Sequence, residues 1–171
     1  EEIISIGIQS IDRMQNLIDN LLNLEHIESG VGVQAVRVDV HELIERCMVD
    51  LQTCLQQRDQ TLHLEVADSL PAITGDIHWL YHALFNLLSN ANKYTPEGGD
   101  IVLRAYERDD ELYLEVEDNG KGIPPETQAR LFERFYRANT DGNVKGTGLG
   151  LSIVESVAEQ HNGRAFVQSQ V

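Results

Sequence analysis

Cysteine, aromatic residues and long apolar runs are all scarce in this sequence. Its two cysteines, Cys47 and Cys54, are seven positions apart on a predicted helix. That spacing separates them by about 10 Å, too far for a disulfide, so we expect two buried, reduced thiols. No run approaches the ~20 apolar residues of a membrane span, and no signal-peptide pattern opens the chain. We therefore expect a cytoplasmic piece of a longer protein, itself without direct membrane contact.

Positive charge is also scarce. Thirteen Lys and Arg residues oppose 28 Asp and Glu residues, which gives a formal net charge of -15. This field disfavours a nucleic-acid surface, and a bound polyphosphate would need local cations or a metal ion. The candidate cations near the motifs described below are Lys93, Arg134, Arg137 and Lys145.

An apolar stripe at helical spacing opens the chain and predicts a helix over residues 3–28. The stripe combines a seven-residue repeat with intervening apolar positions, at Ile4, Ile11, Ile18, Met14 and Leu21. Ser29 and Gly30 are expected to end this helix. Because a lone helix cannot bury such a stripe, the pattern indicates dimerisation.

The rest of the chain alternates strand and helix signals. Asp39 and Asp76 each precede an apolar periodic segment and are expected to be N-caps. The predicted elements are a strand at 36–40, a helix to 58, a strand at 62–66, a helix at 77–93, a hairpin of 100–107 and 111–117, a short helix near 126–135, a helix at 147–161 and a strand at 164–169. This order predicts an α+β fold, an α/β sandwich with a mixed sheet and its helices mainly on one face.

Four motifs carry candidate chemistry, and the first follows the predicted hairpin. Residues 117–124 contain Asp118, Gly120, Gly122 and Ile123. The glycines allow close approach of the backbone to a flat ligand, and the carboxylate can accept a hydrogen bond from an exocyclic amine. An ordinary Asp-Asn-Gly turn explains this motif equally well.

The second motif is a glycine-rich loop that opens into a helix. Its residues are Lys145, Gly146, Thr147, Gly148, Leu149, Gly150 and Leu151. Backbone N–H groups at a helix N-terminus bind phosphate. The loop is neither a Rossmann fingerprint, since no strand directly precedes it, nor a P-loop, since no Lys-Ser/Thr follows the last glycine.

The third motif lies on the predicted helix at 77–93. Asn86 and Asn90 share one face because they are four residues apart, and their amide oxygens suit Mg²⁺. Lys93 can reach a phosphate, and Tyr94 offers a ring to a base or ribose. For any one of these residues, an ordinary polar side chain on a solvent-exposed helix face is the alternative interpretation.

The fourth motif is the aromatic and basic segment 131–137. Its aromatic side chains can anchor a loop, while Arg134 and Arg137 can engage a terminal phosphate. An ordinary amphipathic turn is the alternative interpretation.

Together, and in this order, the four motifs resemble the N, G1, F and G2 boxes of the ATP-binding domain of sensor histidine kinases. That domain belongs to the superfamily shared with gyrase and mismatch-repair ATPases. The resemblance covers about residues 10–170, and Arg13–Gly30 resembles the second helix of the family's dimerisation and phosphotransfer hairpin. It implies a Bergerat-type (GHKL) fold divided into residues 1–30 and 31–171, with the last strand of the sheet missing. It also implies transfer of the γ-phosphoryl group of ATP to a histidine, a homodimer, and a response regulator receiver domain as partner of the full-length protein.

The resemblance assigns a role to each candidate residue. Asn90 is the implied Mg²⁺ ligand, supported by Asn86, and Arg134 or Arg137 steadies the γ-phosphate. Asp118 binds the adenine amine beside Tyr94. The other implied nucleotide contacts are Lys93, Gly120, Gly122, Ile123, Lys145, Gly146, Thr147, Gly148, Leu149, Gly150 and Leu151. The glycine-rich loop then forms one end of a lid over about residues 124–147.

One family feature is missing. The family's acceptor box, His-Glu-Leu-Arg-Thr-Pro-Leu, is absent, and His41-Glu42-Leu43 is followed by Ile44-Glu45 instead. We therefore expect ATP binding with little autophosphorylation of this chain. Asn86 stands where the family's hydrolytic ATPases have a glutamate, and an amide cannot act as a base, which favours phosphoryl transfer. The alternatives are an ATPase or serine kinase of the superfamily, or a nucleotide-binding dimerisation module.

Overall fold

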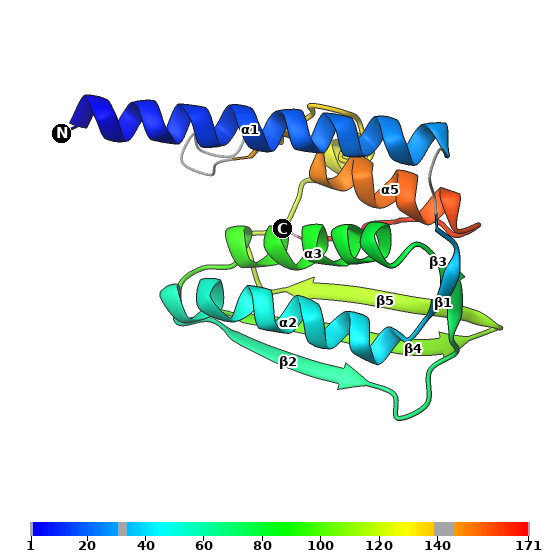
Figure 1. The fold of residues 1–171 in the computed structure, drawn as a ribbon. Coiled ribbons are helices and arrows are strands. Elements are labelled where there is room, and N and C mark those ends of the chain that lie inside the picture. Colours follow the sequence, from blue (N-terminus) through cyan, green and yellow to red (C-terminus); the bar gives the residue numbers. More distant parts are fainter. Residues whose placement is uncertain (1, 31–33, 139–145, 171) are drawn as a thin grey trace.

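The computed structural model describes residues 2–30, 34–138 and 146–170. In chain order the elements are α1 (Glu2–Ser29), β1 (Val36–Val38), α2 (Val40–Gln57), β2 (Thr61–Val66), β3 (Ile73–Gly75), α3 (Ile77–Tyr94), β4 (Asp100–Arg108), β5 (Glu111–Asp118), α4 (Pro125–Gln128) and α5 (Gly150–Gln160). Figure 1 shows α2 and α3 over one face of the larger sheet, α5 beside α3, and α1 lying along α5. The predicted sandwich of helices on a mixed sheet is confirmed.

The larger sheet has the order β2-β4-β5, in which β4 pairs in parallel with β2 and antiparallel with β5. Asp109 and Asp110 join β4 to β5 with φ values of 53° and 61°, which suits the two-residue turn of a twisted hairpin. Short polar side chains tolerate this left-handed backbone better than most residues. β1 pairs antiparallel with β3 in a separate ladder. The three residues of β3 were missed because so short a segment carries no readable alternation.

Side-chain caps begin two of the helices, as predicted. The Asp39 carboxylate accepts a hydrogen bond from the His41 N–H at the start of α2, at 2.9 Å. The Asp76 carboxylate accepts one from the His78 N–H at the start of α3, also at 2.9 Å. Each cap satisfies an amide that the helix itself cannot pair.

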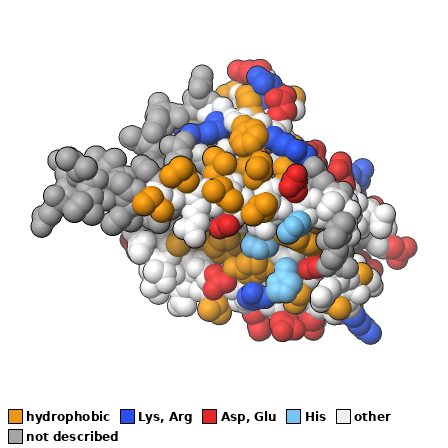
Figure 2. All heavy atoms as spheres, turned by 45° about the horizontal axis from the view of Figure 1, so that its top comes forward, with side chains coloured by type: hydrophobic (Ala, Val, Ile, Leu, Met, Phe, Trp, Pro, Cys, Tyr) orange, Lys and Arg blue, Asp and Glu red, His pale blue; other side chains and the backbone are white. Residues whose placement is uncertain are grey.

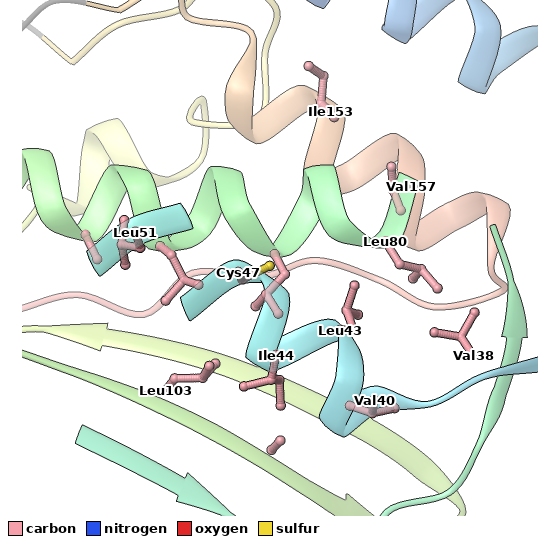
Figure 3. Packing of buried hydrophobic residues seen from close by; sticks show 14 of the residues in the cluster. Val38, Val40, Leu43, Ile44, Cys47, Leu51, Leu80, Leu103, Ile153 and Val157 are labelled. Atoms are coloured by element: carbon pink, nitrogen blue, oxygen red, sulfur yellow. The ribbon is translucent and has the colours of Figure 1, made fainter. Parts of the chain in front are cut away.

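The core lies between the helices and the inward face of β4. Alternate β4 residues Ile101, Leu103 and Ala105 are fully buried, as the two-residue period of a strand requires. Figure 3 shows Leu103 facing the apolar side of α2, including Ile44. This packing fixes α2 and α3 on the sheet and so holds the candidate site residues of α3 in place.

The two cysteines differ in environment. Cys47 is buried in the core, whereas Cys54 is exposed, so the expectation of two buried thiols is wrong for Cys54. Near the end of α2 the inward position is taken by Leu55, not by Cys54. Burial raises the pKa of the Cys47 thiol from 9.0 to about 12.

Among the α1 side chains that the structure describes, the buried ones lie near the C-terminal end of the helix. Leu24 and Ile27 are each 1% exposed and join the core cluster that contains Ile153 and Val157 of α5. The large apolar side chains farther along α1 are exposed: Ile11, Met14, Ile18, Leu21 and Leu22. Figure 2, which turns the α1 side toward the reader, shows hydrophobic side chains gathered on this face. Among the described helices, none is both long enough and apolar enough to cross a bilayer.

Three predicted elements near the C-terminal half were wrong in type or extent. Residues 163–170, where a strand was predicted, form no strand. The Ile123 N–H donates to the Ser169 side chain, at 2.9 Å from Oγ, and not to a backbone carbonyl oxygen as it would in a β-ladder. The helix predicted near 126–135 ends at Gln128, and Phe135 has a φ of 62°, which no right-handed helix allows. The helix predicted from 147 begins at Gly150, since Gly148 has a φ of 75°.

Candidate functional site

The N-terminus of α5 meets the amide-bearing face of α3. Asn86 and Asn90 are half-buried on α3, one turn apart, as their spacing predicted. A Cβ built on Gly150 would lie 3.1 Å from Asn86 Oδ1, so only a residue without a side chain fits there without displacement. The fold thus brings the third predicted motif directly against the second.

The first turn of α5 leaves amides for a ligand. The N-cap residue, Leu149, makes no side-chain cap hydrogen bond, and its own N–H donates to Thr147 Oγ1 at 3.4 Å. Leu149 itself is fully buried, and its carbonyl accepts a hydrogen bond from Ser152 Oγ at 2.9 Å. The buried anchor fixes the start of an eleven-residue helix, whose unpaired amides and dipole favour a phosphate group.

The aromatic segment is pinned to the glycine-rich loop. The Phe135 N–H donates to the Gly148 carbonyl oxygen at 2.9 Å. A Cβ on Gly148 would come within 2.7 Å of the Phe135 backbone. Phe135 is one of the aromatic residues predicted to anchor a loop, but its positive φ leaves no signal in composition or spacing. The contact joins the second and fourth predicted motifs.

Local contacts shape the segment that carries the predicted arginines. Arg130 pairs with Glu133 at 2.9 Å, and this ion pair lowers the pKa of the Glu133 carboxyl. The Arg130 guanidinium also lies 4.3 Å from the ring centroid of Tyr136. Arg134 and Arg137 are both exposed on this segment, close in sequence to the Phe135–Gly148 contact.

The turn after β5 packs against the end of α3. The Gly120 N–H donates to Asp118 Oδ1 at 2.9 Å, which holds the carboxylate at the strand end. A Cβ on Gly120 would lie 2.8 Å from the Tyr94 carbonyl oxygen, so the glycine is required for this approach. Gly122 has a φ of 72°. Tyr94 is 40% exposed, which leaves much of its ring uncovered beside this turn.

A further contact, which the sequence did not indicate, fixes Ile123. Gln128 Nε2 donates to the Ile123 carbonyl oxygen at 2.7 Å and to the Ser169 carbonyl oxygen at 3.0 Å. Together with the Ser169 hydroxyl, this amide ties the turn after Asp118 to the last described residues. A single Gln in a polar stretch gives no sequence signal for such a bridge.

The described contacts bring neither Lys93 nor Lys145 together with the other predicted site residues. Lys145 lies outside the described residues. Lys93 is an exposed residue near the end of α3; partial desolvation lowers the pKa of its ammonium group, and the nearby Cys54 of α2 opposes that shift. The predicted residues that the fold does bring together therefore come from α3, the turn after β5, the aromatic segment and the start of α5.

The donor set fits a magnesium nucleotide. Within the described part of the chain, no group of three or more His, Cys, Asp or Glu residues could hold a metal ion by itself. Mg²⁺ keeps several waters and binds through few protein oxygens together with substrate phosphates. The amide oxygen of Asn86, beside Gly150 at the start of α5, and that of Asn90, one turn later on α3, match that mode of binding.

Comparisons with known proteins show the family to which the chain is related. Residues 75–171 match the family described as Histidine kinase-, DNA gyrase B-, and HSP90-like ATPase. The Drug sensory protein A of Synechocystis sp. is 35% identical over 184 aligned residues, covering 100% of this chain and 28% of that protein. The chain therefore spans little more than a quarter of that relative's length.

Solved structures share the fold. The mycobacterial sensor histidine kinase MprB is 34% identical with a TM-score of 0.65, covering 75% of this chain and 81% of that chain. Full-length ShkA, solved in complex with AMPPNP, is 25% identical with a TM-score of 0.78, covering 98% of this chain and 36% of that chain.

The fold and the family match define an ATP-binding α/β sandwich of the Bergerat type. The chain belongs to the histidine kinase-, DNA gyrase B- and HSP90-like ATPase family, and within it to the catalytic ATP-binding domains of two-component sensor histidine kinases.

Proposed function

We propose that this chain binds ATP as its magnesium complex and transfers the γ-phosphoryl group to a histidine of the full-length protein. The observation that carries the proposal is the meeting of the uncapped α5 N-terminus with Asn86, where Gly150 lets the helix start approach the amide closely. Phosphoryl transfer needs mainly positioning and charge stabilisation, and these residues supply both.

The residues of α3 would hold the metal. Asn90 binds Mg²⁺ through its amide oxygen, and Asn86 supports it from one turn earlier. When bound, the ion neutralises charge on the β- and γ-phosphates. Asn86 has no basic atom with which to activate water, so the site favours transfer over hydrolysis.

The remaining contacts would divide between base and phosphates. Asp118 accepts a hydrogen bond from the adenine amine, with the Tyr94 ring beside the base. The wall and lid contacts would come from Lys93, Gly120, Gly122, Ile123, Lys145, Gly146, Thr147, Gly148, Leu149, Gly150 and Leu151. Arg134 or Arg137 would steady the γ-phosphate, since a guanidinium matches phosphate geometry.

The full-length protein would act as a homodimer that passes phosphate to a response regulator receiver domain on the cytoplasmic side. Residues 1–30 would belong to the dimerisation and phosphotransfer domain, and residues 31–171 to the catalytic domain. The exposed apolar side chains of α1 support this division, because such a stripe is stable in water only when a partner helix covers it.

Binding and transfer can be tested separately. A fluorescent ATP analogue should bind this chain in the presence of Mg²⁺, and its affinity should fall when EDTA removes the metal. Labelled ATP should give acid-labile phosphohistidine on the full-length protein, and little label on this chain alone. Rapid release of inorganic phosphate without phosphohistidine would favour an ATPase, and absence of nucleotide binding would favour a dimerisation module.

A further inference from the structure

Asp76 joins three separate parts of the chain. Its carboxylate is buried, with the residue 5% exposed. Oδ1 accepts a hydrogen bond from the His78 N–H, and Oδ2 accepts one from the Gln34 N–H, both at 2.9 Å. The Asp76 N–H in turn donates to Nε2 of His161 at 3.1 Å. The cap of α3 thus also holds the segment before β1 and the end of α5.

The partners of His161 fix its tautomer. Nδ1 lies 2.7 Å from the Val157 carbonyl oxygen, which can only accept, so Nδ1 carries the proton. Nε2 is then the acceptor that the Asp76 N–H requires. A Cβ on Gly75 would lie 2.4 Å from Cδ2 and Nε2 of the ring. The imidazole therefore sits flat against a position that only glycine can occupy.

His161 lies at the C-terminal end of α5, and the candidate nucleotide site lies at the N-terminal end of the same helix. The helix runs from Gly150 to Gln160 with His161 as its C-cap residue, a length of about 16 Å. Its first turn faces Asn86, and its later residues Ile153 and Val157 share a core with the end of α1. Gln34 lies between α1 and β1. One helix thus contacts the candidate nucleotide site at one end and, through His161, contacts at the other end the Asp76 residue that holds Gln34.

We propose that Asp76 and His161 are positioning residues for phosphoryl transfer, which hold the segment joining α1 to the catalytic domain against the C-terminal end of α5. Neither residue touches the nucleotide. They act through Gln34 and α5, so that the catalytic domain keeps one orientation relative to α1 while ATP is bound. This inference rests on the proposed kinase function.

The variants remove one contact at a time. Gln34→Pro deletes the N–H that Asp76 accepts, and Gln34→Ala is its matched control because it keeps that N–H. His161→Phe keeps a flat ring but loses the acceptor, whereas His161→Gln can offer its Oε1 in place of Nε2. Asp76→Asn keeps one acceptor oxygen, which can accept from the N–H of either His78 or Gln34. Its NH₂ group is a donor and therefore faces the remaining N–H without forming a hydrogen bond.

Three measurements then separate positioning from folding and from binding. Circular dichroism and thermal unfolding establish that each variant folds. In this chain, affinity for a fluorescent ATP analogue with Mg²⁺ should stay within about twofold of wild type, and amide exchange at Gln34 should quicken at least tenfold in Asp76→Asn. In the full-length protein, phosphohistidine formation should fall at least fivefold in Gln34→Pro and His161→Phe, and recover to within about twofold in His161→Gln and Gln34→Ala.

Other outcomes overturn the inference. Wild-type transfer rates in Gln34→Pro and His161→Phe would show that the contacts are structural only. A parallel loss of nucleotide affinity and transfer would place the effect in the nucleotide site. Equal loss in His161→Gln and His161→Phe would mean that the acceptor atom is irrelevant. Failure of the wild-type chain to bind nucleotide would instead count against the proposed function.

Discussion

The Phe135 N–H donates to the Gly148 carbonyl oxygen at 2.9 Å, and a Cβ on Gly148 would meet the Phe135 backbone at 2.7 Å. The hydrogen bond and the missing side chain depend on each other, because any residue larger than glycine would push the two segments apart. This contact links the arginine-bearing segment to the loop that begins α5. Both lie where the γ-phosphate is proposed to bind.

Gly148→Ala should therefore weaken nucleotide binding at least tenfold. The φ of 75° costs a non-glycine residue about 1–2 kcal/mol, and the clash with Phe135 adds to this. Titration with a fluorescent ATP analogue and thermal unfolding would measure both effects. Gly146→Ala is the control for folding stability, since a Cβ there has no atom within 4 Å. Equal melting temperatures for the two variants would contradict the argument.

Replacement of the carboxylate at the end of β5 should reduce affinity for the adenine base. Asp118→Asn substitutes an NH₂ group for one acceptor oxygen, and we expect ATP affinity to fall at least tenfold, about 1.4 kcal/mol. Calorimetric titration with a non-hydrolysable analogue would measure this loss. Asp110→Asn, at the other end of β5, makes the same chemical change in a turn that tolerates Asn and should bind normally. Similar losses in both variants would exclude a specific contact of Asp118.

Asn90→Ala should uncouple nucleotide binding from magnesium. The proposed metal ligand is lost, so the affinity gained on adding Mg²⁺ should shrink, and phosphohistidine formation in the full-length protein should fall about a hundredfold. Titrations with Mg²⁺ and with EDTA would measure the difference. Ser89→Ala, the preceding half-buried residue of α3, should retain the full response to Mg²⁺. An unchanged magnesium dependence in Asn90→Ala would reject the assignment.

Stability should decline at alkaline pH. The pKa of Cys47 is raised from 9.0 to about 12 by burial, and that of Tyr81 from 10.0 to about 12 by burial and by its hydrogen bond to Asp50. Because the folded state disfavours ionisation, both groups contribute stability below their ordinary pKa values, and lose it progressively between about pH 9 and 12.

Urea unfolding at several pH values would measure this alkaline loss. Cys47→Ala should flatten the decline, although it lowers stability at neutral pH by leaving a small cavity. Cys54→Ala is the matched control, since Cys54 is exposed and its removal should leave the pH profile unchanged. Identical pH profiles for Cys47→Ala and the wild type would contradict the raised pKa of Cys47.

Much of the candidate site could be predicted from the sequence, because its residues are arranged by interactions between near neighbours in the chain. Asn86 and Asn90 share a face through helical periodicity alone, and the Asp39 and Asp76 caps follow from side chains that bond within their own turn. The hairpin at Asp109 and Asp110 was predicted for the same reason. The errors fall where backbone shape depends on distant partners. The turn at Phe135 needs Gly148, and residues 163–170 bond to Ile123 through a side chain.

The sequence by itself determined the order of elements, the amphipathic faces and the residue types available to a magnesium nucleotide, because these follow from local periodicity and side-chain chemistry. Only the tertiary structure decided which of them meet. It placed Gly150 against Asn86, left Lys93 beside Cys54, and joined Gln34, Asp76 and His161 in one chain of hydrogen bonds. Such contacts depend on how α3 packs against α2 and α5, and no local pattern encodes that packing.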